Sequence, residues 1–157
     1  GDELVMQVSP GGSETPIAVV SDVNYDVIDL GPPLPGDDAV LVTGFPYNVH
    51  STLDEVIGLF SAYVGEARAI RRLGSAAVDL CWVAAGRMDG FWERGLQPWD
   101  TRAGALLVQE AGGTVSGLDG GPWDPAGGHL LASNGRLHQQ MVDVAARFRE
   151  RRRNKTP

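Results

Sequence analysis

Cysteine is nearly absent from the chain, and long apolar runs are missing altogether. The single cysteine, Cys81, cannot form a disulfide within the chain, and its apolar neighbours predict a buried thiol rather than a nucleophile. No apolar run approaches the roughly 20 residues that span a bilayer, and the first residues do not resemble a signal peptide. We therefore expect a cytoplasmic protein with no membrane partner.

Positive charge is also scarce. The chain has 13 Lys and Arg against 20 Asp and Glu, a net charge of −7, so long-range electrostatics favours neither nucleic acid nor anionic lipid as a partner. Residues 147–155 are a basic exception, which a solvated helix end explains better than a nucleic-acid contact. His50, His129 and His138 lack the spacing of metal ligands, so we interpret them as surface or structural residues.

The apolar pattern predicts a layered α/β fold. The 157 residues are 43% hydrophobic and 21% charged, as in an ordinary folded domain. Short strands are expected within the irregular segment 1–38, and longer strands then alternate with helices. The expected strands are 4–8, 17–20, 27–30, 39–44, 67–73, 88–93, 114–115 and 129–133, and the expected helices are 53–64, 76–86, 98–111 and 134 to about 149.

Small polar residues are expected at the helix starts. Ser51 and Ser75 can cap the first two helices, and Ser133 or Asn134 the last. The helix 76–86 has almost no polar face, which predicts burial on several sides.

Two helix starts and one carboxylate are candidates for a binding site. The runs Gly74-Ser75-Ala76 and Trp99-Asp100-Thr101 each open a helix after a strand or turn, where free N–H groups suit an anion such as phosphate. Glu93 ends an aromatic strand seven residues before Asp100, so the two carboxylates can face one cleft at the sheet edge. The local pattern alone favours ordinary capping over ligand binding for Ser75 and Asp100, and it leaves the role of Glu93 open between binding a hydroxyl and facing water.

Longer motifs resemble the C-terminal half of the inositol monophosphatase family. They are Gly74–Leu80 (GSAAVDL), Val83–Glu93 (VAAGRMDGFWE) and above all Trp99–Gly113 (WDTRAGALLVQEAGG). Thr43–Tyr47 and Leu131–Gly135 also resemble family segments, so the resemblance covers residues from about 39 to 145.

The resemblance implies a fold, a reaction and a set of site residues. Family members are magnesium-dependent, lithium-sensitive phosphomonoesterases with a layered αβαβα fold, so a mixed β-sheet flanked by helices is expected. Asp100 matches a Mg²⁺ ligand, and is thereby the expected catalytic residue. Gly74, Ser75 and Ala76 match the turn that contacts the substrate, and Glu93 matches the residue that binds a substrate hydroxyl. Hydrolysis of a polyol or sugar phosphate by a metal-activated water is the implied activity.

Two parts of the family pattern are missing. We find neither the upstream glutamate nor the Asp-Pro-Ile-Asp-Gly-Thr segment that supplies most metal ligands, because residues 26–31 lack the proline and the Gly-Thr pair. We therefore expect a fragment or split-gene product that is inactive alone. In this interpretation 1–38 is a remnant of the preceding sheet region, 39–149 is the C-terminal α/β domain and 150–157 is a basic tail.

The missing N-terminal half also determines which partners we expect for this chain. Its loss would expose surfaces that the layered fold covers, and Trp82, Phe91 and Trp92 are candidates for that interface. We expect association with a complementary chain carrying the N-terminal half, or self-association into a homo-oligomer, besides a small phosphorylated substrate. The alternative is a catalytically inactive binding or assembly module of the same fold, in which Asp100 is only a helix cap.

Overall fold

The computed structural model describes residues 38–154, and this part of the chain alternates strands with helices as expected. The strands expected before residue 38 lie outside the described residues. The elements are β1 (Val40–Thr43), the 3-10 helix η2 (Val49–Ser51), α1 (Leu53–Val64), β2 (Ala69–Arg71), α2 (Ala76–Ala84), β3 (Gly90–Arg94), α3 (Pro98–Glu110), β4 (Thr114–Ser116), β5 (His129–Ser133) and α4 (His138–Arg153).

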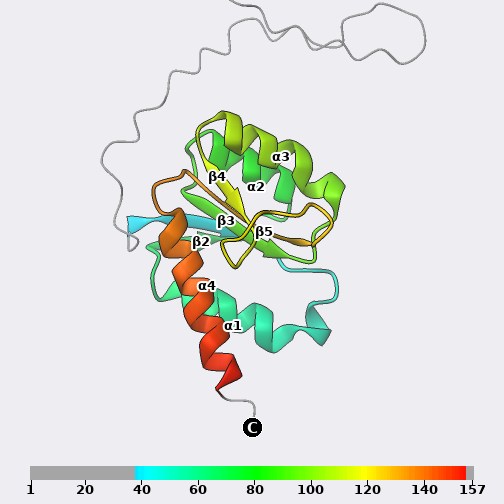
Figure 1. Cartoon of the computed structure of the whole chain (residues 1–157), viewed down its shortest axis with the longest axis vertical. Helices are drawn as coiled ribbons and strands as arrows, with labels where there is room; N and C mark the ends of the chain where they lie inside the picture. Colours follow the sequence, from blue (N-terminus) through cyan, green and yellow to red (C-terminus); the bar gives the residue numbers. More distant parts are fainter. Residues whose placement is uncertain (1–37, 155–157) are drawn as a thin grey trace, which may run out of the picture.

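The strands form one mixed sheet in the order β2-β1-β3-β5-β4. Strands β2, β1 and β3 are parallel, whereas β5 is antiparallel to both of its neighbours. Helices α2 and α3 cover one face of the sheet, and α1 and α4 cover the other (Figure 1). The α/β class with a mixed sheet flanked by helices is thus confirmed.

Side-chain alternation along β3 divides the core into two clusters. Phe91 packs in the cluster under α2 and α3, and the next residue, Trp92, packs in the cluster under α1 and α4. The Trp92 ring lies 4.1 Å from the Tyr63 ring, centroid to centroid. Phe91 and Trp92 are only 0% and 3% exposed, so their expected place at an interface is wrong: β3 is a central strand with helices on both faces.

Helix α2 is buried on one side only, contrary to the expected burial on several sides. Val78 is 45% exposed. Cys81, three residues later, and Ala85, four residues after Cys81, are also exposed, so these residues follow one side of the helix. The expected buried thiol at Cys81 is therefore wrong. Helix α3 likewise exposes Leu106 and Leu107. The two helices form the outermost described layer on their side of the sheet, so their outward residues meet no neighbour among residues 38–154.

Two of the expected helix caps are also wrong. Thr52 occupies the N-cap of α1 and Leu137 that of α4, in place of Ser51 and of Ser133 or Asn134. These polar side chains make other contacts: the Ser51 hydroxyl donates to the Asn48 carbonyl, Ser133 Oγ lies 3.0 Å from the His138 ring, and Asn134 donates to the Asp89 carboxylate.

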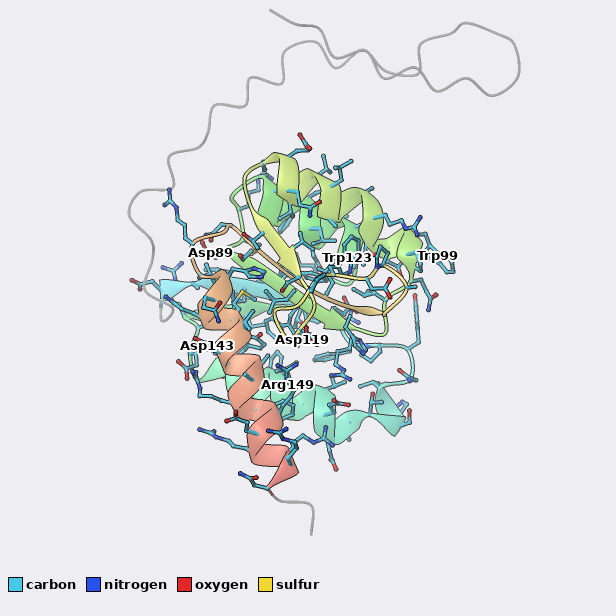
Figure 2. All side chains as sticks on the ribbon, viewed as in Figure 1. Asp89, Trp99, Asp119, Trp123, Asp143 and Arg149 are labelled. Carbon is cyan, nitrogen blue, oxygen red and sulfur yellow. The ribbon has the colours of Figure 1, made fainter. Side chains whose placement is uncertain are left out.

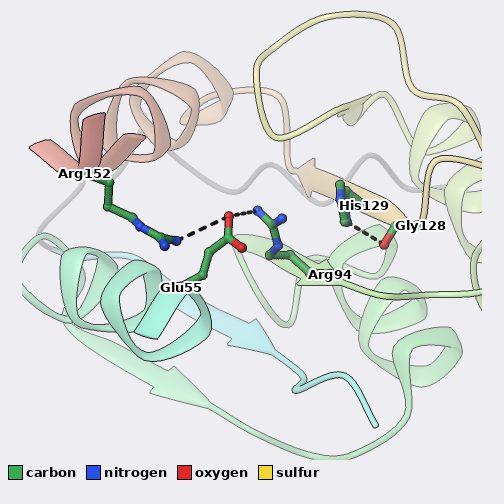
Figure 3. Close-up of polar contacts among 5 residues, drawn as sticks. All are labelled: Glu55, Arg94, Gly128, His129 and Arg152. Carbon is green, nitrogen blue, oxygen red and sulfur yellow. Dashed lines mark hydrogen bonds and ion pairs between the residues drawn. The ribbon is translucent and has the colours of Figure 1, made fainter. Parts of the chain in front are cut away.

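Helix α4 is longer than expected, because it continues through the basic residues to Arg153. Glu55 on α1 pairs with Arg94 at the end of β3, at 2.9 Å, and with Arg152 on α4, at 3.6 Å (Figure 3).

Among residues 38–154, none of the helices combines the length and the apolar character that a membrane span needs.

Candidate active site

The expected site residues lie on elements that meet at one edge of the sheet. The parallel strands β2, β1 and β3 end at the same edge, and α2 and α3 begin just after β2 and β3. Gly74, Ser75 and Ala76 form the start of α2, Glu93 is the last but one residue of β3, and Asp100 lies in the first turn of α3. The fold thereby brings the candidate residues to one edge.

The start of α2 leaves its first backbone N–H groups without a side-chain cap. Ser75 occupies the N-cap position with an extended backbone, but its hydroxyl makes no capping hydrogen bond. Gly74 has φ +102°, a backbone conformation that residues other than glycine rarely adopt. The expected cap at Ser75 is therefore correct in position only, and the uncapped N–H groups suit an anionic ligand.

The Asp100 side chain caps the start of α3, although Asp100 lies within the first turn of the helix and not at the N-cap position. Its carboxylate accepts a hydrogen bond of 2.9 Å from the backbone N–H of Gln97, which is the N-cap of α3. The bond engages one carboxylate oxygen, Oδ2, and fixes the side chain at the helix start. The neighbouring Trp99 is 78% exposed at the periphery of the molecule (Figure 2).

Glu93 is buried at the end of β3 on the face covered by α2 and α3. Its carboxyl group lies so close to Gly44, just beyond β1, that a methyl group on Gly44 would collide with it. Burial raises the pKa of Glu93 to about 7, with further upward contributions from the charges of Asp79 and Asp100, while Arg72 opposes them. The charges of Asp79, Asp100 and Arg72 therefore bear on the protonation of Glu93.

Two of these neighbours, Asp79 and Arg72, were not among the expected site residues. Asp79 is 0% exposed, and neither carboxylate oxygen has a hydrogen-bond partner among residues 38–154. Burial raises its pKa to about 6, against the opposing charge of Arg72. The sequence does carry one signal for Asp79, because it is the only charged residue in α2.

Close packing of α2 on α3 sets the distance between the two helix starts. A methyl group on Gly104 would lie 2.5 Å from Leu80 Cβ. Any residue larger than glycine at this position of α3 would therefore force Leu80 or α2 to move. Both helices are thus held tightly behind the site.

A complete metal site is not formed by the described residues. Within 38–154 no group of three or more His, Cys, Asp or Glu side chains is arranged to hold a metal ion. The carboxylate of Asp100 is nevertheless the kind of oxygen donor that Mg²⁺ prefers, and its bond to Gln97 leaves one oxygen for a ligand. The described residues therefore fit one ligand of a magnesium site, Asp100, and not a complete site.

Comparison with known proteins identifies the chain's relatives. The model of the inositol monophosphatase family matches residues 14–151, a longer stretch than the motifs alone indicated. The chain belongs to the inositol monophosphatase family. It is 47% identical over 110 residues to an inositol-1-monophosphatase of Synechocystis and 46% identical over 108 residues to the Nus factor SuhB of Pseudomonas aeruginosa.

The match to solved structures supports the same assignment. An inositol monophosphatase from Anabaena superposes with a TM-score of 0.70 and 42% identity, covering 72% of this chain and 45% of that one. The match to the Synechocystis protein covers 70% of this chain and 38% of that protein. The match to SuhB covers 68% of this chain and 40% of SuhB. The chain thus spans about two fifths of the length of these relatives.

Proposed function

We propose that this chain is the C-terminal part of a magnesium-dependent phosphomonoesterase that acts on a polyol or sugar phosphate. In this proposal the chain supplies one metal ligand and several substrate contacts. The observation that carries it is the meeting of Glu93, Asp100 and the uncapped start of α2 at one sheet edge. The name of the Synechocystis relative, an inositol-1-monophosphatase, supports the substrate class.

The described residues have distinct roles in substrate binding. The backbone N–H groups at Ser75 and Ala76 donate hydrogen bonds to the phosphate, and the missing side chain of Gly74 lets the ligand approach. Glu93 binds a substrate hydroxyl through its carboxyl group. Because its pKa is raised to about 7, this group changes from a donor and acceptor to an acceptor only near neutral pH.

Asp100 would hold the metal through the carboxylate oxygen that Gln97 does not engage. Magnesium, when bound, supplies neutralisation of phosphate charge and activation of water. The chain lacks the upstream glutamate and the Asp-Pro-Ile-Asp-Gly-Thr segment that supply most metal ligands in the family, so the isolated chain is expected to be inactive.

The outer face of α2 and α3 is the surface on which we propose that the rest of the family fold packs. Val78 on α2 and Leu106 and Leu107 on α3 are 45%, 56% and 42% exposed, and large exposed apolar residues on two neighbouring helices favour an interaction surface. A complementary chain that carries the N-terminal half would cover these residues, and self-association is the alternative for the isolated chain.

A binding or assembly module is the second candidate function. The observation that favours it is the 46% identity to a protein named as a Nus factor. In this alternative Asp100 acts only as a cap and binds no metal.

Manganese, a paramagnetic substitute for magnesium, distinguishes the two candidates. In NMR spectra of the labelled chain in complex with an N-terminal half that carries the remaining family ligands, Mn²⁺ should broaden the backbone signals of 99–101 more than those around the exposed acid Asp143. Asp100→Asn should abolish this difference, although its amide oxygen can still accept the Gln97 hydrogen bond. Equal broadening at Asp100 and Asp143 would support the capping role and contradict the metal ligand.

A further inference from the structure

Gly44 follows β1 and lies beside Glu93 of the neighbouring strand. The ladder between β1 and β3 pairs Val42 with Phe91, two residues before Gly44 and Glu93 on their strands, so the same register places Gly44 next to Glu93. Alternate residues of a strand face the same side of a sheet, and Val42 and Phe91 pack under α2 and α3. Gly44 is therefore the cross-strand neighbour of Glu93 on the face of the sheet that carries the candidate site.

The Glu93 carboxyl group occupies the space that a side chain on Gly44 would take. A methyl group on Gly44 would overlap the carboxyl group, and its three nearest atoms would be Glu93 Cδ, Oε1 and Oε2. The φ of Gly44 lies outside the left-handed region, so its backbone conformation does not require glycine. What glycine provides at this position is room for the carboxyl group.

The end of β1 is fixed to β3 just before this contact. The Thr43 hydroxyl donates a hydrogen bond of 2.6 Å to the Trp92 carbonyl, and both residues are buried. Moving the strands apart would break this buried bond, which costs more than rotating one side chain. A side chain at position 44 would therefore displace the Glu93 carboxyl group, because that group is the far end of a flexible side chain.

The place of this carboxyl group matters because β1 lies between the two halves of the candidate site. In the sheet, β1 separates β3, which carries Glu93, from β2, after which the uncapped α2 begins at Ser75. Because the Glu93 carboxyl group extends over the end of β1, it lies on the side of β3 toward this helix start. A side chain at position 44 would push the carboxyl group back and away from the helix start.

We propose that Gly44 is a positioning residue: the absence of its side chain fixes the Glu93 carboxyl group over the end of β1, at the place where it binds a substrate hydroxyl. The proposal rests on the proposed function for the role of Glu93. Gly44 itself touches no substrate. It acts through Glu93, and sets where the substrate hydroxyl lies relative to the phosphate at the start of α2.

The first test observes Glu93 in the full chain and needs neither metal nor substrate. With ¹³C-labelled glutamate, the carboxyl signal of Glu93, assigned with Glu93→Gln, is followed by NMR against pH. Gly44→Ala should move the midpoint from about 7 to lower pH, because the displaced carboxyl group is less buried. Gly90→Ala is the matched control: it lies on β3 as well, but its methyl group meets Met141. The Glu93 titration should be unchanged in Gly90→Ala, and an unchanged titration in Gly44→Ala would refute the proposal.

A double variant decides the case in which Gly44→Ala does not fold. If the methyl group conflicts only with the carboxyl group, Gly44→Ala combined with Glu93→Ala should fold and should unfold at the same urea concentration as Glu93→Ala alone. A double variant that still fails to fold would show that the backbone requires glycine, and would overturn the proposal.

The second test measures hydrolysis of inositol 1-phosphate by the chain in complex with an N-terminal half. Gly44→Ala should raise KM roughly tenfold and leave kcat nearly unchanged, because Glu93 binds a hydroxyl and not the reacting phosphate. An unchanged KM in Gly44→Ala would contradict the positioning role. Absence of turnover in the wild-type complex would instead contradict the proposed function, and the Glu93 titration would still decide the role of Gly44.

Discussion

The raised pKa of Glu93 makes the stability of the protein depend on pH in a defined way. Its pKa rises from 4.5 to about 7 on folding, so between these values the folded protein holds a proton that the unfolded chain has released. The unfolded state is then favoured as pH rises, and stability is lost between pH 4.5 and 7. A shift of this size corresponds to about 3 kcal/mol, because one pKa unit is about 1.4 kcal/mol.

Glu93→Gln removes this titration with little change in shape. Urea unfolding of the wild type and the variant, measured from pH 5 to pH 8, should show the wild type losing up to about 3 kcal/mol relative to the variant. His129 and His138, whose pKa values burial lowers, give the opposite slope below pH 6.5, but they are present in both proteins and cancel.

Glu110→Gln, at an exposed acid on α3, serves as the control and should follow the wild type. Parallel pH dependence in the wild type and Glu93→Gln would refute the argument, since it would show that Glu93 titrates alike in the folded and unfolded states.

Two further predictions concern packing, one between α2 and α3 behind the site and one between α1 and α4 on the other face of the sheet. Gly104→Ala should lower the free energy of unfolding by roughly 1 to 3 kcal/mol, because its methyl group forces Leu80 and α2 away from α3; an unchanged unfolding midpoint would contradict the close packing. Tyr63→Phe should cost about 1 kcal/mol, because it removes the 2.9 Å hydrogen bond to the Met141 carbonyl; chemical denaturation measures this, and equal stability would mean that water replaces the hydroxyl.

The sequence was sufficient to predict the order and type of the described elements. The apolar spacing of 53–64 and the alternation of strands with helices depend on local chain geometry, and the structure follows them. Helix caps were harder to predict, because polar residues such as Ser133 and Asn134 form tertiary hydrogen bonds instead of capping α4.

Burial could not be predicted from the same pattern. An apolar residue is buried only if another layer covers it, so the pattern of α2 could not distinguish the exposed Cys81 from the buried Leu80. For the same reason the unpartnered Asp79 was not recognised, because its importance depends on what surrounds it.

The candidate site was predictable in part. The motifs around Gly74, Glu93 and Asp100 indicated the residues, but their common edge depends on the parallel order of β2, β1 and β3, which no local pattern determines. The capping bond from Gln97 to Asp100 was anticipated as a possibility, and the structure shows it.

Reconstitution tests the central claim most directly. The chain would be combined with the portion of the Synechocystis inositol-1-monophosphatase that lies outside the matched region, and hydrolysis of inositol 1-phosphate would be measured with and without Mg²⁺. We predict magnesium-dependent turnover by the combined chains, none by either part alone, and loss of turnover in Asp100→Asn. A stable complex without turnover, or full turnover with Asp100→Asn, would contradict the account.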